Sequence, residues 1–407
     1  MKRALVGAKD GTGDSGKPNS DKVVLVGVYG RETPKAMAED HLDELARLVE
    51  TAGGVVVARA LQERRSPDGA TYIGKGKVRE VAEAAEALGA GWTVFDDELS
   101  ASQVKNLEKE LPTHVMDRPG VILQIFAARA RSREAMTQVE LARLQYMLPR
   151  LAGASSGLEQ QRGGGAFRGG FGEKKLELDR RKIRKRIATL KEELVRVEKG
   201  REVRRKTLRR VPTVSLVGYT NAGKTTLFNK LTHSKELAED RLFATLDPRH
   251  ARLSGVGGRA IVLADTVGFL RKLPHDLVAS FRSTLAEAQE SDLVVHVVDA
   301  SSPQADEQKR VADELLAELG VDASRVLLAY NKVDVKGGTF GTAEIASAKS
   351  PATRAADLVA NHSAVSISAL TGGGLAELRA AIVERLSALG VTIPRYGNAP
   401  VEEAAAR

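Results

Sequence analysis

A stretch beginning at Val214 combines glycine, lysine and threonine at the spacing of a phosphate-binding loop. The stretch reads VSLVGYTNAGKTTLFNKL: an apolar run, then Gly218, four residues, Gly223, Lys224 and Thr225, and then a helical start. Glycines permit a tight turn whose amides converge on a phosphate, assisted by the N-terminus of the following helix. The lysine can reach the β- and γ-phosphates, and the threonine hydroxyl can bind Mg²⁺. The pattern predicts a site for a nucleoside triphosphate.

Two later apolar runs end in residues suited to guanine. The run RVLLAYNKVD ends in Asn331, Lys332 and Asp334. A carboxylate at Asp334 can accept from the two adjacent N–H donors of guanine, a pattern that adenine lacks. Asn331 can contact the other edge of the base, and Lys332 can line it. The run VSISAL ends at 368–370, where a backbone amide could meet the guanine carbonyl. In this order the motifs predict a GTP site.

Between these motifs, the run IVLADTVGF places Asp265 at the end of an apolar strand. Its carboxylate can hold Mg²⁺ through water, and the amide of Gly268 can face the γ-phosphate. Many GTPases follow this glycine with a glutamine that orients the attacking water, whereas this chain has Phe269. Because a phenyl ring cannot orient water, we expect slow intrinsic hydrolysis, with Mg²⁺, Lys224 and loop amides supplying the electrostatic stabilisation.

A candidate switch threonine lies in RLFATLDP, residues 241–248. Thr245 is the best candidate for a residue that binds Mg²⁺ only when the γ-phosphate is present. The competing interpretation is an ordinary strand edge.

Apolar runs that alternate with helical patterns must position these groups. They begin at Val23, well before the nucleotide motifs, with runs at 23–29, 55–61 and 92–95. This alternation predicts an α/β fold with a small parallel sheet. The glycines and lysines of YIGKGKV at 72–78 could form a second site, for ATP, but without a complete phosphate loop we favour a simple connection.

Two helical seams separate this region from the nucleotide motifs. Leucines recur at three- and four-residue spacings after Ser132, and a second seam runs from about Glu173 to Val203. An antiparallel helical hairpin buries both seams. Its tip, GLEQQRGGGAFRGGFG, holds seven glycines between residues 157 and 172. The tip is either a long linker or a platform whose arginines and phenylalanines contact RNA; the residues alone favour neither.

Positive charge is concentrated in this hairpin. The net charge of the chain is +9, and residues 168–210 hold 18 Lys and Arg against 7 Asp and Glu. Such a segment suits a polyanion, although a solvated helix face is the commoner explanation of a charge run by itself. The 407 residues contain no cysteine, which excludes disulfides and thiolate metal sites. No apolar run approaches the ~20 residues that span a bilayer, so we expect a cytoplasmic protein without membrane insertion.

The combined motifs resemble those of the HflX GTPases. The resemblance rests on GYTNAGKTTLFN, LFATLDP, DTVGFLRKLPHDLVASFRSTL and NKVD, preceded by YIGKGKV, DRPGVILQIFAARARSREAMTQVELARL and LDRRKIRKRI, and it spans about Val23 to Leu389. It implies a GTPase that binds the large ribosomal subunit and its RNA, brings the hairpin tip to the peptidyl transferase centre, and splits or rescues stalled ribosomes. The family's tip ends in GPGETQ, whereas this chain has GGFGEKK.

The resemblance also implies a set of site residues. Those that touch GTP or Mg²⁺ would be Gly218, Tyr219, Thr220, Asn221, Ala222, Gly223, Lys224, Thr225, Thr226, Phe243, Ala244, Thr245, Leu246, Asp247, Asp265, Thr266, Val267, Gly268, Asn331, Lys332, Val333, Asp334, Ser368, Ala369 and Leu370. Thr225 and Thr245 would bind the metal, and Lys224, Thr245 and Gly268 would act in catalysis.

We therefore expect five parts. They are a flexible tail (1–22), an N-terminal α/β domain (23–131), a basic helical hairpin (132–210), a P-loop GTPase domain (211–389) and a short C-terminal tail (390–407). The expected function is Mg²⁺-dependent GTP hydrolysis stimulated by the ribosome, by a protein that is monomeric off the ribosome. The alternative is an RNA-binding or ribosome-assembly scaffold that GTP regulates and in which hydrolysis is incidental.

Overall fold

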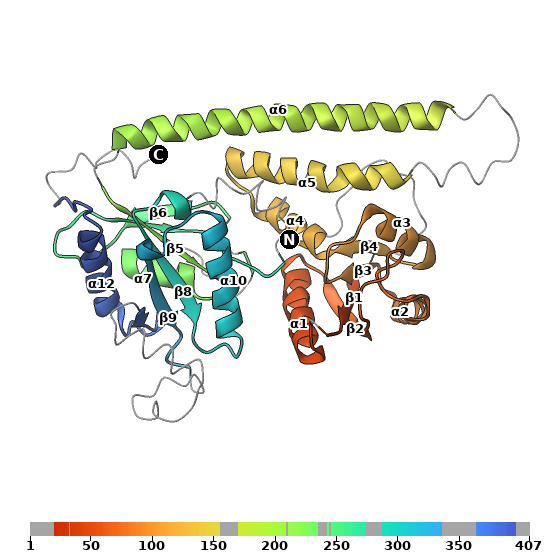
Figure 1. The fold of residues 1–407 in the computed structure, drawn as a ribbon, viewed down its shortest axis with the longest axis horizontal. Helices are drawn as coiled ribbons and strands as arrows, with labels where there is room; N and C mark the ends of the chain where they lie inside the picture. The colour runs from red at the N-terminus through yellow and green to blue at the C-terminus, as the bar shows by residue number, and fades with distance from the viewer. Residues whose placement is uncertain are drawn as a thin grey trace, which may run out of the picture. The chain divides into compact units, whose positions relative to one another are not determined.

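The computed structural model describes residues 20–31, 33–154, 170–208, 211–234, 242–243, 246–272, 287–335 and 364–395. They form two compact units. The first takes in the chain up to Arg196 together with Lys272, and the second takes in the rest. The expected fold class is confirmed: an α/β domain with a parallel sheet, a helical hairpin and a P-loop GTPase domain follow one another along the chain (Figure 1). The expected division into five parts stays a prediction.

The first unit is built on a four-stranded parallel sheet of order β2-β1-β3-β4. Its strands are β1 (Lys22–Tyr29), β2 (Val55–Glu63), β3 (Trp92–Phe95) and β4 (His114–Asp117). The central strand β1 buries an unbroken apolar run, as parallel strands covered on both faces do.

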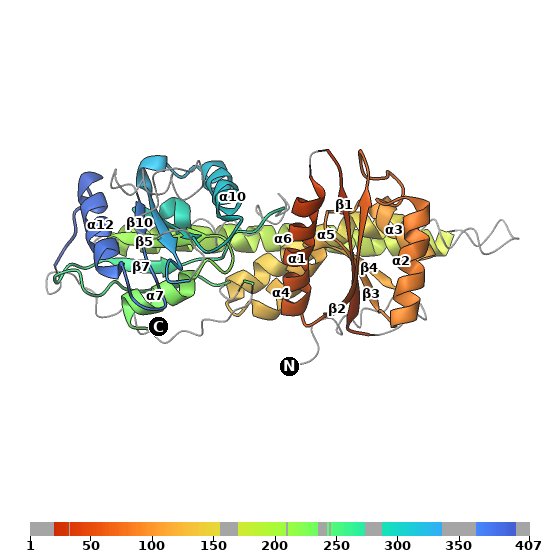
Figure 2. The ribbon, with the colours of Figure 1, turned by 90° about the horizontal axis from the view of Figure 1, so that it is seen from below.

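Helices cover both faces of this sheet. They are α1 (Lys35–Thr51), α2 (Lys75–Leu88), α3 (Ala101–Glu110) and α4 (Arg118–Arg129). Figure 2 shows α1 on one face and α2 and α3 on the other, and α4 packs beside α1. Apolar periodicity did not predict α3, β4 or α4; only two of the four residues of β4 are apolar, and α3 buries a single residue, Leu107.

Two long helices form the hairpin, α5 (Arg133–Ala154) and α6 (Gly170–Leu208). α5 packs on α3 and α4, and α6 runs antiparallel beside α5 (Figure 1). Arg186 on α6 donates two hydrogen bonds of 2.7 Å to the carboxylate of Glu140 on α5, and Leu190 between the helices is fully buried. α6 begins before the expected Glu173 and continues past Val203. Residues 155–169, which include most of the glycine-rich tip, lie outside the described residues.

The second unit holds a six-stranded sheet of order β10-β9-β8-β5-β7-β6, parallel except that β6 is antiparallel to β7. Its strands are β5 (Thr213–Gly218), β6 (Arg249–Arg252), β7 (Val262–Asp265), β8 (Leu293–Asp299), β9 (Val326–Asn331) and β10 (Ala364–Ser366). The predicted motifs follow β5, β7, β9 and β10. In a parallel sheet these carboxyl ends share one edge, where open α/β sheets bind ligands.

The helices of this unit are α7 (Lys224–Thr232), α10 (Ala305–Glu318) and α12 (Leu375–Ala388), with a 3₁₀ turn at Ala323–Arg325. Residues of α7 and α12 join one apolar core with alternate residues of β8, among them Val295 and Val297. The intervening His296 faces the other way and pairs with Asp313 of α10 at 3.1 Å. Since successive strand residues point to opposite faces, α10 covers the face opposite α7 and α12.

Candidate active site

The loop between β5 and α7 has a backbone that only glycine permits at two places. Gly218 has a φ of +144°, and a Cβ there would lie 2.2 Å from the carbonyl oxygen of Val297. Gly223 has a φ of +90°, and a Cβ there would lie 2.3 Å from Nδ2 of Asn331. The loop therefore packs against β8 and against the guanine motif. Within it, Asn221 is exposed, Ala222 and Thr220 are buried, and Thr226 is half-buried in the first turn of α7.

Lys224 is held inside this loop. Its ammonium donates to the carbonyl oxygens of Gly218 and Tyr219 at 3.0 and 2.9 Å, and the side chain is almost fully buried. Burial lowers the pKa of Lys224 to about 8, although the charge of Asp265 opposes the change. The cation is thus fixed where a phosphate would pass through the loop, with two backbone carbonyls as its partners.

Two oxygen donors meet next to this lysine. The Thr225 hydroxyl donates to Oδ2 of Asp265 at 2.8 Å, and Asp265 is fully buried at the end of β7. Pairing of β5 with β7 places Asp265 beside Leu216, whose carbonyl oxygen accepts from the Thr266 hydroxyl at 2.7 Å. Hydroxyl and carboxylate oxygens are the donors that Mg²⁺ prefers. Among the described residues no cluster of three acidic or histidine side chains forms a metal site, so such an ion would need phosphate oxygens and water as further ligands.

Asn331 joins the guanine motif to the phosphate loop. Its Nδ2 donates to the Ala222 carbonyl at 2.8 Å, and its Oδ1 accepts from the Ala369 amide at 2.9 Å. Residues more than one hundred positions apart in the chain therefore meet through one buried side chain. Asp334 is exposed, as a carboxylate that receives a base must be, and Val333 is half-buried.

The last predicted segment lies against the same asparagine. Ser368 and Ala369 are buried, and Leu370 is 71% exposed. The Ser368 hydroxyl accepts from the Thr371 amide at 3.0 Å and so fixes the turn after β10. These contacts bring the segments around Gly218, Asp265, Asn331 and Ser368 to one edge of the sheet.

The candidate switch segment is described only in part. Phe243 and Leu246 are buried, Phe243 with a φ of +56°, and Asp247 is half-buried. None of these three is in a strand, and β6 starts only at Arg249. Ala244 and Thr245 lie outside the described residues, so the role of Thr245 stays a prediction.

The side chain of Phe269 is buried inside the protein. It is 1% exposed. Its amide donates to the Gly218 carbonyl at 2.9 Å and its carbonyl accepts from the Thr220 amide at 2.8 Å. The preceding Val267 is also buried, whereas a Cβ on Gly268 would lie 3.0 Å from the ammonium of Lys224. The segment therefore presents backbone, rather than the phenyl ring, beside Lys224.

Comparisons with known proteins agree with this geometry. Three family models match the chain: GTP-binding GTPase N-terminal at residues 39–127, GTP-binding GTPase Middle Region at 129–208, and 50S ribosome-binding GTPase at 213–332. A GTPase HflX of Lacrimispora saccharolytica is 48% identical over 89% of this chain and 82% of its own length. A GTPase HflX of Escherichia coli is 42% identical over 90% and 83%.

The chain belongs to the HflX family of GTPases. It is accordingly a GTP-hydrolysing enzyme, and the resemblance noted from the motifs is confirmed. The crystal structure of SsGBP in complex with GDP is similar to it, with a TM-score of 0.51 and 27% identity over 91% of this chain and 100% of that one. In the described part of this HflX protein, no helix is long and apolar enough to cross a membrane.

Sequence reasoning missed two groups of ion pairs, one in each unit. In the second unit, Lys332 has a φ of +65° and its ammonium lies 2.7 Å from the carboxylate of Asp299, at the end of the neighbouring strand β8. Asp299 is paired with Asn331 in the sheet register. The sequence could have indicated this proximity, because each of the two polar residues ends an apolar run.

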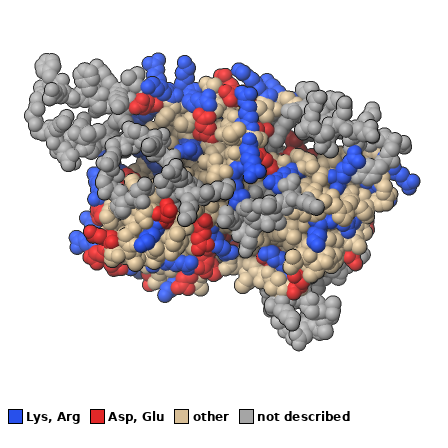
Figure 3. Space-filling model, turned by 180° about the vertical axis from the view of Figure 1, so that it is seen from behind, with Lys and Arg blue, Asp and Glu red and all other residues tan. Residues whose placement is uncertain are grey.

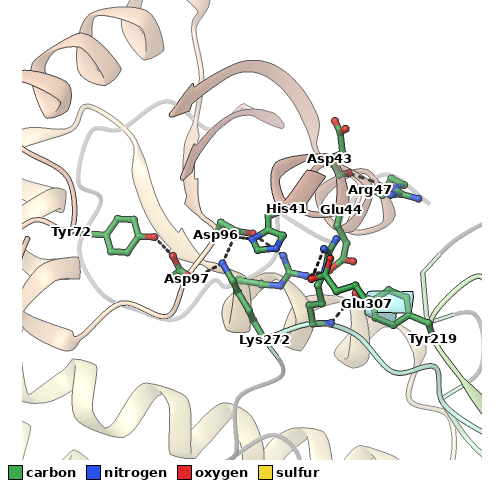
Figure 4. A network of polar contacts seen from close by, with 12 residues as sticks. His41, Asp43, Glu44, Arg47, Tyr72, Asp96, Asp97, Tyr219, Lys272 and Glu307 are labelled. Carbon is green, nitrogen blue, oxygen red and sulfur yellow. Dashed lines mark hydrogen bonds and ion pairs between the residues drawn. The ribbon is translucent and has the colours of Figure 1, made fainter. Parts of the chain in front are cut away.

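In the first unit, Lys272, three residues after Phe269, pairs with Asp96 and Asp97 at 2.5 Å each (Figure 4). Asp96 also accepts from the buried Arg118 at 2.7 Å. The sequence signal was weak here, because the residues that pair are 176 positions apart.

Proposed function

We propose that this HflX GTPase acts on the large ribosomal subunit, alternates between GTP and GDP states, and uses this cycle to split or rescue ribosomes in the cytoplasm. The observation that carries the proposal is a cationic face on α6. The match to a model of 50S ribosome-binding GTPases supports it. GTP and GDP would bind at the carboxyl edge of the second sheet.

The charge on α6 is segregated. Ile183, Ile187 and Leu190 lie on the side that packs, and Leu190 is fully buried. With 3.6 residues per turn, Arg181 and Lys185 fall on the opposite side of the helix, and both are exposed. Arg196, three turns further on, is also on that side, with its side chain 78% exposed. Figure 3 shows Lys and Arg side chains projecting along the upper edge, where α6 lies in Figure 1.

The partner best suited to such a face is RNA, rather than an apolar protein surface or a single nucleotide. Exposed cations that make few ion pairs attract phosphate groups, and their binding releases counterions. Arg196 is 3.9 Å from Glu192, a distance that screened surface pairs easily give up. The helix therefore offers a long surface for a polyanion without unfolding any part of the hairpin.

The nucleotide would be held by the groups already described. Backbone amides of the loop from Gly218 to Gly223 would surround the β-phosphate, and the Lys224 ammonium would reach the β- and γ-phosphates. Asp334 would accept from guanine. Thr225 and Asp265, together with Thr245, would hold Mg²⁺, which would supply neutralisation of the charge that develops on the phosphate oxygens.

Hydrolysis would depend on backbone groups and on the partner. The amide of Gly268 would donate to the γ-phosphate, and Lys224 would stabilise the negative charge that develops on the leaving GDP. The side chain of Phe269 cannot orient water, because the phenyl ring has no hydrogen-bonding group and is buried. We therefore assign the ribosomal subunit the task of completing the site, either by acting on Thr245 or through its own RNA groups.

A scaffold that binds RNA and hydrolyses GTP only incidentally is the second candidate. The same cationic face supports it, because this face is exposed in the absence of a nucleotide. A Lys224→Ala variant separates the two: a scaffold keeps most of its affinity for the RNA of large subunits, whereas a switch loses the affinity difference between its GTP and GDP states.

The test of the proposal is binding to purified large subunits in the presence of a non-hydrolysable GTP analogue. The variant replaces Arg181, Lys185 and Arg196 with alanine. At roughly threefold per lost phosphate contact we expect about 10- to 30-fold weaker binding and a salt dependence reduced by about 2 units of slope. The matched control should bind within twofold of the parent. It replaces three cations of the N-terminal domain with alanine, namely Lys35, Arg79 and Lys109. Equal losses in both variants would remove the assignment of α6.

A further inference from the structure

The second residue of the phosphate loop has two polar groups directed to different partners. The hydroxyl oxygen of Tyr219 accepts from the amide of Arg271 at 2.9 Å. Its carbonyl oxygen accepts from the ammonium of Lys224 at 2.9 Å. The side chain is 4% exposed, so the hydroxyl makes its contact inside the protein. One residue therefore contacts both the phosphate-binding cation and the segment that follows Gly268.

The hydroxyl extends a short ladder of backbone hydrogen bonds. The Phe269 amide donates to the Gly218 carbonyl, and the Thr220 amide donates to the Phe269 carbonyl, at 2.9 and 2.8 Å. These bonds make a parallel bridge between Tyr219 and Phe269. The tyrosine hydroxyl adds a third contact two residues further along, where backbone pairing has ended. Together the three bonds fix the register of residues 269–271 against the phosphate loop.

This register decides where the Gly268 backbone lies. A Cβ on Gly268 would be 2.8 Å from the methyl group of Thr220 and 3.0 Å from the ammonium of Lys224. Gly268 is therefore packed closely against Thr220 and Lys224, and because it directly precedes Phe269, the position of its amide is coupled to the register of the following residues. The Gly268 amide and Lys224 are the groups proposed to contact the γ-phosphate.

The Arg271 amide is a buried donor whose hydrogen bond goes to the Tyr219 hydroxyl. Arg271 is 5% exposed, and its guanidinium lies 3.2 Å from Glu307 on α10. Figure 4 shows Tyr219 and Glu307 close together. A buried backbone N–H that loses its acceptor carries a desolvation cost. Phenylalanine at position 219 would keep the ring and leave this donor without the hydroxyl.

We propose that Tyr219 is a positioning residue for the GTP state: through its hydroxyl it holds residues 269–271 in register and so aims the Gly268 amide at the γ-phosphate. Tyr219 need not touch the reacting atoms. This inference rests on the proposed placement of the γ-phosphate between Lys224 and Gly268. GDP has no γ-phosphate, so its binding should not depend on the hydroxyl.

The experiment compares full-length protein with its Tyr219→Phe variant. Affinities for GDP and for a non-hydrolysable GTP analogue are measured by fluorescence titration, and GTP hydrolysis is measured in single turnover. The result expected is about a tenfold loss in analogue affinity and in hydrolysis rate, as for one hydrogen bond at 1.4 kcal/mol per tenfold, with GDP affinity changed less than twofold. Equal losses for GDP and the analogue would show a merely structural role and overturn the proposal. No change in any of the three would overturn it too.

Two further variants make the outcome specific. Tyr330→Phe removes another buried tyrosine hydroxyl from the same unit and should leave the ratio of analogue to GDP affinity unchanged. Lys224→Ala tests the site itself. If this lysine variant binds both nucleotides normally, the proposed phosphate site is wrong; if it binds neither while Tyr219→Phe behaves as the parent, only the role of Tyr219 is wrong.

Discussion

The hydroxyl of Thr225 and the carboxylate of Asp265 are joined by a hydrogen bond of 2.8 Å, although forty residues separate them in the sequence. One residue begins α7 and the other ends β7, so the sheet and the phosphate loop together create the pair. It places two hard oxygen donors beside the buried ammonium of Lys224. A nucleotide with its metal can therefore be received without rebuilding the loop.

Removal of the threonine hydroxyl should uncouple nucleotide binding from Mg²⁺. For Thr225→Ala we expect the stimulation of GTP-analogue affinity by Mg²⁺ to fall by about tenfold or more, because one metal ligand is lost. Titrations with and without Mg²⁺ measure the effect. Thr225→Ser keeps the hydroxyl and should behave as the parent; if serine and alanine variants are alike, the hydroxyl is not a metal ligand.

The depressed pKa of Lys224 should make nucleotide binding depend on pH. Burial sets this pKa at about 8 in the free protein, and phosphate favours the ammonium form, so binding takes up a proton above that pH. Between pH 7 and 8.5 GDP affinity should fall about fourfold. Calorimetry in buffers of different ionisation enthalpy measures the proton uptake.

The lowered pKa of Lys224 also makes the free energy of unfolding depend on pH. Between pH 8 and the ordinary lysine value of 10.5, the unfolded chain binds more protons at Lys224 than the folded chain does. The nucleotide-free protein should therefore gain stability from this group as the pH rises through that window. A Lys224→Arg variant stays charged and should lose both pH effects; if it retains them, another group is responsible.

Base selection should follow Asp334. In Asp334→Asn an amide donor replaces a carboxylate acceptor, so the two N–H donors of guanine lose their partner. We expect GTP affinity to fall by about 100-fold or more, and xanthosine triphosphate, which carries a carbonyl in place of one donor, to bind better than GTP. Competition titrations with both nucleotides provide the measurement. An unchanged preference for GTP would remove Asp334 from the site.

Lys272 should stabilise the N-terminal domain through Asp96 and Asp97. Burial raises the pKa of Asp97, but Lys272 outweighs it, so the pKa lies below its ordinary value. A lowered carboxylate pKa contributes stability above the unfolded value and loses it as the pH falls through the folded value. Lys272→Met should thus lower the unfolding free energy by about 1 to 2 kcal/mol at pH 7, since the pair is partly exposed, and by much less below pH 3.

Denaturant titration of the full chain at both pH values measures this effect. The control Lys77→Met breaks the surface pair with Glu80 and should cost less than about 0.5 kcal/mol. A pH-independent loss in Lys272→Met would mean that the side chain stabilises by packing alone.

The sequence indicated which residues form the glycine loop and which end strands, whereas their contacts with GTP and Mg²⁺ stay predictions. The loop glycines, Lys224 and the residues that end strands were all identifiable because strand ends and residue types are local features. What it could not predict is which groups pair across the fold. Asn331 was expected to contact guanine, which stays a prediction; its bonds to Ala222 and Ala369 show that it joins two loops.

For Phe269, too, the sequence showed the residue type but not the contacts. Its apolar type correctly excluded a water-orienting hydrogen bond, but periodicity did not show that the ring is buried while its backbone pairs with the phosphate loop. Likewise the tyrosine at position 219 had no sequence signal for its bond to Arg271, since the partner is a backbone amide 52 residues away. The strand β4 was missed because only two of its four residues are apolar, whereas the equally short β3 reads WTVF.

We propose that the protein alone has an incomplete hydrolytic site and that the large ribosomal subunit completes it. Single-turnover GTP hydrolysis, measured with and without purified large subunits at two salt concentrations, tests this most directly. We predict slow hydrolysis without subunits and a stimulation of at least about 100-fold with them, weakened at the higher salt because the cationic face of α6 contributes to binding. A rate that subunits leave unchanged while GTP remains bound would contradict the account.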